Sequence, residues 1–151
     1  SLVSWCYGDL GVGTAVLSAG RRAGRPEWTD AALEVLRSAA RRRRGASDFV
    51  RDCCLCHGTA GNGHVFARCF HATGEGVFAD AARYWFRLTL EDAHDQRGRF
   101  GYRTWIQVGP GEMGWRESPG FLSGNAGIAL GLLAAATDLE PRWDRLLLVD
   151  L

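Results

Sequence analysis

The chain has 151 residues, 46% of them hydrophobic, and a net charge of +1 at pH 7, which suits one globular domain. This near-neutral charge provides no electrostatic field that would indicate nucleic acid or an anionic membrane as a partner. No apolar run reaches the roughly 18 residues of a membrane span, and five cysteines without a secretory signal favour a reduced, cytoplasmic protein.

The hydrophobic pattern predicts a chain made mainly of helices. Two segments are apolar almost all round, which predicts helices buried on all sides, and two are amphipathic, which predicts helices of an outer layer. A loosely alternating stretch followed by Gly109-Pro110-Gly111 predicts a β-hairpin insertion, and the tail predicts a short helix or strand. In chain order the predicted elements are helices 11–22, 26–44, 61–73 and 77–92, the hairpin around 100–111, helix 127–137 and the tail 141–151.

An internal repeat organises these elements. Residues 6–11, 56–61 and 122–127 share a Gly-x-x-Gly core, and each core precedes a predicted inner helix. A cysteine stands two residues before the first glycine in the first two copies, and Leu122 takes that place in the third. We therefore predict one all-α domain over 1–151, a two-layer ring or solenoid of helical hairpins with repeats at about 1–54, 55–118 and 119–151.

The repeat predicts where the metal-binding side chains meet. Equivalent cores lie at the same end of successive inner helices, so Cys6, Cys56 and His57 are expected to converge although fifty residues separate the two cysteines. Thiolate and imidazole are preferred ligands of Zn²⁺, and three protein ligands with one open position are typical of a catalytic zinc site. Cys53 and Cys54 have no repeat equivalent and are predicted not to be ligands, although either could close a structural site.

Two other interpretations of this segment remain open from the residues alone. The cysteines could form a buried cluster of reduced thiols beside an exposed histidine, because free cysteine often behaves as a small apolar residue. Residues 53–57 also fit the C-x-x-C-H pattern of c-type haem attachment, with Cys53 and Cys56 bound to haem, His57 as axial ligand and Met113 as the sole methionine available opposite it.

Three segments together carry a resemblance to a known family. Residues 5–8 (WCYG), 55–61 (LCHGTAG) and 120–130 (GFLSGNAGIAL), with the closing 143–148 (WDRLLL), are similar in order to the C-terminal part of lanthionine synthetase C-like cyclases. The Cys-His-Gly form at 56–58 resembles the stand-alone class I enzymes. The resemblance covers essentially the whole chain.

The resemblance implies an α/α toroid of seven hairpins, of which about three are present, with Cys6, Cys56 and His57 as the ligands of a Zn²⁺. It implies a lanthipeptide cyclase that adds a peptide Cys thiolate to dehydroalanine or dehydrobutyrine. The implied partners are a dehydrated precursor peptide, a dehydratase and the missing N-terminal half of the toroid. In this family an alternative activity is the binding or modification of other thiols such as glutathione.

The resemblance implies that the acid and the base of this reaction are a histidine and an aspartate from hairpins upstream of Ser1. The chain is accordingly expected to be an incomplete fragment that binds zinc and is inactive alone. Within the chain, Tyr7 and His64 are the weaker candidates for catalytic groups, Tyr7 because it adjoins Cys6 and His64 because it lies two helical turns after His57. His71 and His94 are expected at helix ends or on the surface.

Overall fold

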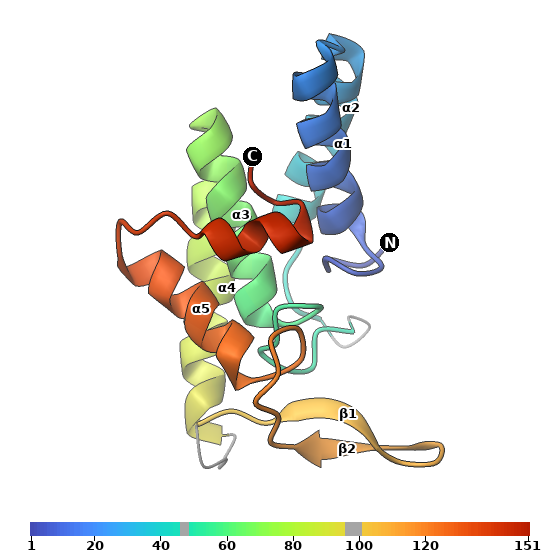
Figure 1. The fold of residues 1–151 in the computed structure, drawn as a ribbon, viewed down its shortest axis with the longest axis vertical. Helices are drawn as coiled ribbons and strands as arrows, with labels where there is room; N and C mark the ends of the chain where they lie inside the picture. Colours follow the sequence, from blue (N-terminus) through green and yellow to red (C-terminus); the bar gives the residue numbers. More distant parts are fainter. Residues whose placement is uncertain (46–48, 96–100) are drawn as a thin grey trace.

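The computed structural model describes residues 1–45, 49–95 and 101–151. Helices dominate these ranges, with one small antiparallel sheet (Figure 1). The elements are α1 (Asp9–Ala23), α2 (Pro26–Ala40), α3 (Thr59–Thr73), α4 (Gly76–Asp95), β1 (Thr104–Gly109), β2 (Glu112–Arg116), α5 (Asn125–Ala136) and the 3₁₀ helix η1 (Arg142–Leu147). The predicted all-α fold is confirmed, and none of the helices in these ranges is long and apolar enough to cross a membrane.

The helices form two layers. α1 packs on α2 and α3 packs on α4, so each short connection closes a helical hairpin. α3 also contacts α1 on one side and α5 on the other, while α2 contacts α4. The helices α1, α3 and α5 therefore form the inner layer that the repeat predicts, and α2 and α4 form the outer layer.

Glycine ends the first helix of each hairpin. Gly24 after α1 and Gly74 after α3 have φ of 63° and 73°, the left-handed conformation that glycine adopts without steric cost. The Gly74 N–H donates to the Phe70 carbonyl at 2.7 Å, which satisfies one of the free carbonyls at the end of the helix. Pro26 then occupies the first position of α2, where its missing N–H costs nothing.

The core lies between the two layers. Leu17 of α1, Leu36 of α2, Phe66 of α3 and Trp85 of α4 are fully buried in one apolar cluster. The C-terminal tail closes this cluster, because Val149 is buried in it and the Trp5 indole N–H donates to the Leu147 carbonyl at 2.8 Å. Residues from both ends of the chain thus cover the same core.

The prediction that the two apolar helices are buried on all sides is wrong for this chain. Val12 of α1 is 63% exposed and Leu133 of α5 is 48% exposed. The physical reason is that α3 is the main helical neighbour of α5, so only one side of α5 is covered within the described ranges. An apolar helix becomes buried all round only when neighbours stand on every side.

The predicted hairpin insertion is confirmed. β1 and β2 pair antiparallel, with Trp105 opposite Trp115 and their rings 5.4 Å apart in an edge-to-face contact. The turn at Pro110 and Gly111, where Gly111 has φ of 74°, joins the strands. The hairpin extends from the helical body at the end where α3 and α5 begin (Figure 1). Phe100, the predicted start of this stretch, lies outside the described residues.

Candidate metal centre

The three loops that precede α1, α3 and α5 share one backbone hydrogen-bond pattern. The first residue of each helix donates its N–H to the carbonyl seven residues earlier: Asp9 to Leu2 at 2.9 Å, Thr59 to Asp52 at 3.0 Å and Asn125 to Ser118 at 2.8 Å. Gly8, Gly58 and Gly124 are the extended N-cap residues of the three helices. The repeat found in the sequence is therefore also a repeat in backbone structure.

The second glycine of each core is required by close packing of the loop. A Cβ placed on Gly11, Gly61 or Gly127 would lie 1.9 Å from the carbonyl oxygen of Trp5, Leu55 or Phe121, respectively. Because these contacts are with backbone atoms, no side-chain rotation relieves them. Glycine at this position lets each loop fold back onto the first turn of its own helix.

The loops are hydrogen-bonded to one another. The N–H groups of Trp5 and Cys6 donate to the Cys56 carbonyl at 3.1 and 3.3 Å, and the Cys56 N–H donates to the Leu122 carbonyl at 3.0 Å. The N-terminal ends of α1, α3 and α5 point toward the same end of the molecule (Figure 1). Cys6 and Cys56 are thus held side by side, as the repeat predicts.

Three side chains converge at this junction. A sulfur of Cys6, a sulfur of Cys56 and a ring nitrogen of His57 lie within 4.8 Å of one another. All three residues are partly exposed, and both cysteines are free thiols. The site therefore combines three atoms of metal-ligand type with access from solvent.

The donor set fits a zinc ion. Ligand atoms on one tetrahedral zinc stand about 3.3–3.8 Å apart, given Zn–S and Zn–N bonds of about 2.3 and 2.0 Å, and atoms that lie within 4.8 Å of one another are compatible with this spacing. Two sulfurs and one imidazole nitrogen are the ligand types that zinc prefers. Cys6, Cys56 and His57 would leave one of four positions without a protein ligand.

Burial controls the protonation of the thiols in the metal-free protein. Desolvation, together with hydrogen bonding to Cys6, raises the pKa of the Cys56 thiol to about 12. Desolvation likewise raises the pKa of the Cys53 thiol to about 12 and raises that of Cys54. A metal ion at this site must therefore displace a proton from Cys56.

A second group of donors shares His57. An oxygen of Asp52, the Cys54 sulfur and a ring nitrogen of His57 also lie within 4.8 Å of one another, and Asp52 and Cys54 are fully buried. The sequence pattern did not predict Asp52 as a site residue. The available signal was a lone acidic residue four positions before Cys56 in an otherwise apolar cysteine-rich run.

The weaker catalytic candidates have different surroundings. Tyr7 is 87% exposed, so it is not a packing aromatic within the described structure. His64 is buried, stacks on Trp143 and forms a hydrogen bond from Nε2 to Oδ2 of Asp144 at 3.1 Å. It belongs to neither donor group of the described residues. His71 is exposed, as expected, while the His94 side chain lies outside what the structure describes.

The haem interpretation does not fit the position of Cys53. Its side chain is fully buried and packs with Ala60 and Ile128, and its thiol lies 3.7 Å from the Asp92 carboxylate. Attachment to haem would need the sulfurs of Cys53 and Cys56 on one accessible surface. The structure instead directs Cys56 toward Cys6 and Cys53 into the interior.

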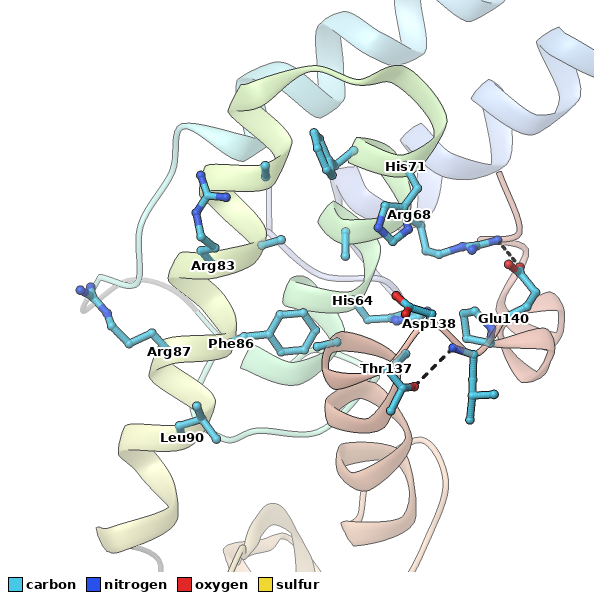
Figure 2. A pocket seen from close by; sticks show the side chains of 18 residues that line it. His64, Arg68, His71, Arg83, Phe86, Arg87, Leu90, Thr137, Asp138 and Glu140 are labelled. Carbon is cyan, nitrogen blue, oxygen red and sulfur yellow. Dashed lines mark hydrogen bonds and ion pairs between the residues drawn. The ribbon is translucent and has the colours of Figure 1, made fainter.

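A separate pocket of about 770 Å³ lies between α3, α4 and the segment after α5 (Figure 2). Phe86 and Leu90 of α4 line one wall, and Arg68 reaches across to Glu140 in an ion pair of 3.1 Å. No member of either donor group lines this pocket. It is therefore distinct from the candidate metal centre.

The fold and the site together define a helical-hairpin protein that gathers two cysteines and one histidine where its inner helices begin. The family model for the lanthionine synthetase C-like proteins matches residues 1–148. The chain belongs to this family. A comparison with the curated proteins finds no match.

Proposed function

We propose that the chain is the zinc-binding part of a lanthipeptide cyclase. The observation that carries the proposal is the convergence of Cys6, Cys56 and His57 from two loops of equivalent structure. Membership of the lanthionine synthetase C-like family supports the thioether-forming class of reaction. The proposed substrate is a precursor peptide in which Ser or Thr residues have been dehydrated.

Cys6, Cys56 and His57 would hold a Zn²⁺. When bound, zinc supplies a positive charge that lowers the pKa of a thiol in its fourth position, which favours the nucleophilic thiolate at neutral pH. Two thiolate ligands on the protein balance much of the ion's charge. A substrate thiolate beside them should therefore keep its nucleophilicity.

The proposed reaction is an addition in which nothing leaves. The peptide thiol loses its proton, and its sulfur forms a bond to the β-carbon of dehydroalanine or dehydrobutyrine. The carbon–carbon π bond breaks, and a proton is delivered to the α-carbon. The product is lanthionine or methyllanthionine, with the same mass as the substrate.

The chain's own residues would bind and orient the peptide cysteine. The partly exposed Cys6, Cys56 and His57 give access to the site, and the exposed Tyr7 follows directly after one of the sulfur donors. An acid is still required for the α-carbon, and we propose that it is a histidine or aspartate outside residues 1–151.

The exposed apolar surfaces support a larger assembly. Val12 and Leu133 lie on inner helices and are exposed apolar residues, and apolar faces of this kind normally pack against a partner. We propose that these faces contact further hairpins of the same toroid. A dehydratase is the proposed enzyme that supplies the substrate.

The metal assignment is tested by measuring bound zinc in purified protein. We expect about one zinc per chain in the unaltered protein, no stoichiometric zinc in Cys56→Ala, and retained zinc in the matched control Cys53→Ala. The same retention is expected for Cys54→Ala. Stoichiometric zinc in Cys56→Ala would overturn the ligand assignment.

The activity is tested with a dehydrated precursor peptide and the longest form of the protein that contains this chain. Because ring closure leaves the mass unchanged, each ring is counted as one thiol that no longer reacts with N-ethylmaleimide. The control is Cys56→Ala in the same protein. If the number of reactive peptide thiols stays the same and the peptide instead gains the mass of glutathione, transfer of a thiol would be favoured over cyclisation.

A further inference from the structure

Asp52 is a buried acidic residue in the loop that carries Cys56 and His57. Its side chain has no solvent exposure. The Cys54 N–H donates to Oδ1 at 3.0 Å, and the Trp105 N–H of strand β1 donates to Oδ2 at 2.9 Å. No salt bridge to Asp52 is found among the described residues. Since each carboxylate oxygen accepts more than one hydrogen bond, Asp52 retains accepting capacity.

The other two loops show that loop folding does not require this carboxylate. Leu2 and Ser118 occupy the position equivalent to Asp52, and their carbonyls accept the same helix-start hydrogen bond. The Ser118 hydroxyl also reproduces the bond to the residue two positions later, accepting from the Gly120 N–H at 3.3 Å. One side-chain oxygen is therefore enough for the local turn, and the second oxygen of Asp52 is particular to the loop with His57.

The position of Asp52 relative to His57 suggests a partner for the remaining accepting capacity of the carboxylate. A carboxylate oxygen lies within 4.8 Å of a ring nitrogen of His57. A histidine that binds a metal through one nitrogen carries a hydrogen on the other, and this N–H is commonly oriented by a carboxylate. Asp52 is the acidic residue within this distance of His57 in the donor groups of the described chain.

We propose that Asp52 is a positioning residue of the metal centre, and that its carboxylate accepts the N–H of the His57 nitrogen that does not bind the metal. This inference rests on the zinc site proposed above. Asp52 fixes the orientation of the imidazole and strengthens it as a ligand. The bond from Trp105 holds the carboxylate in place, so strand β1 supports the metal centre although it supplies no ligand.

The competing arrangement is a metal bound directly by Asp52, Cys54 and His57. Asp52 and Cys54 are fully buried, whereas Cys6 and Cys56 are partly exposed. An ion held by the buried group would be closed to a substrate thiol. The two arrangements make different predictions for Cys54, which is a ligand only in the competing one.

The test measures the zinc dissociation constant by competition with a chromophoric chelator. We expect Asp52→Asn to weaken zinc binding by about 10–100-fold. Ser118→Ala, the matched control at the equivalent position of the third loop, should change it by less than about twofold. If Asp52→Asn and the unaltered protein bind zinc with equal affinity, the positioning role is overturned. Loss of zinc in Cys54→Ala would also overturn it, because Cys54 is a ligand only in the competing arrangement. Absence of zinc from the unaltered protein would instead refute the proposed function.

A double-mutant cycle separates positioning from general structural support. In His57→Cys the ligand is a thiolate without a second N–H, so adding Asp52→Asn should leave zinc affinity unchanged. An equal loss in both backgrounds would overturn the proposal. If Asp52→Asn does not fold, NMR of the zinc-loaded unaltered protein decides: a His57 imidazole N–H protected from solvent exchange is expected, and a rapidly exchanging one contradicts the bond.

Discussion

Replacing Gly61 with alanine tests how rigidly the start of α3 positions the proposed zinc ligands. The new Cβ would lie 1.9 Å from the Leu55 carbonyl oxygen and 2.6 Å from the Leu55 carbonyl carbon. Non-bonded Cβ contacts under 3.0 Å are essentially not observed, so the backbone of Leu55 must move by about 1 Å or more. Leu55 directly precedes Cys56, and the donor atoms of the site must therefore move with it.

The expected effects are on both stability and zinc affinity. Forcing an added methyl group into close-packed structure costs about 1–3 kcal/mol, and we expect Gly61→Ala to lower the free energy of unfolding by this amount. Zinc affinity should fall at least tenfold, because metal ligands tolerate only small displacements. Urea unfolding of the metal-free protein and chelator competition measure the two quantities separately.

Two matched alanine variants make the result interpretable. Gly76 is the first residue of α4 and a Cβ there meets nothing within 4 Å, so Gly76→Ala should be neutral or stabilise by up to about 1 kcal/mol. Gly127→Ala creates the same 1.9 Å contact in the loop without a ligand, so it should reduce stability with a smaller effect on zinc. Unchanged zinc affinity and stability in Gly61→Ala would refute this reasoning.

Three further predictions concern protonation and buried charge. Because burial raises the pKa of Cys56 to about 12, zinc binding at pH 7 should release at least one proton. Calorimetry in buffers of different ionisation enthalpy measures this release, and a result of no released proton would contradict the prediction. Burial also raises the pKa of Cys69 to about 12. The neutral thiol contributes its full stabilisation of the fold below about pH 9, and this contribution is lost as pH rises toward 12, at up to about 1.4 kcal/mol per pH unit. Urea unfolding should therefore give a free energy of unfolding that depends less on pH in this range for Cys69→Ala than for the unaltered protein. Asp144 is fully buried and accepts hydrogen bonds from His64 and Arg68 at 3.1 and 3.0 Å. Asp144→Asn should therefore lower the free energy of unfolding in urea by about 2–4 kcal/mol. Glu140→Gln, a change at an exposed partner of Arg68, should lower it by less than about 1 kcal/mol, and equal losses would contradict the role of the buried network.

The sequence alone was sufficient for the presence and order of the helices, the hairpin and the pairing of Cys6 with Cys56, although the helix predicted over 26–44 ends at Ala40. Hydrophobic periodicity and the repeated Gly-x-x-Gly core are local properties, and they determine helix positions and the equivalence of the three loops. A repeat places equivalent residues at the same end of successive helices. The convergence of two cysteines fifty residues apart therefore followed without knowledge of the structure.

Burial and side-chain partners depended on the tertiary structure, because they arise from residues far apart in the chain. The spacing of His64 from His57 suggested that they share a helix face, but His64 forms its hydrogen bond with Asp144, eighty residues further on. Apolar composition predicted full burial of α5, yet its exposure depends on which neighbours are present. The partners of Asp52 could be seen only in the tertiary structure, where strand β1 and His57 both lie beside it. Local sequence determined the helices and the convergence of Cys6 and Cys56, whereas packing between distant segments decided which polar groups are buried and what each of them contacts.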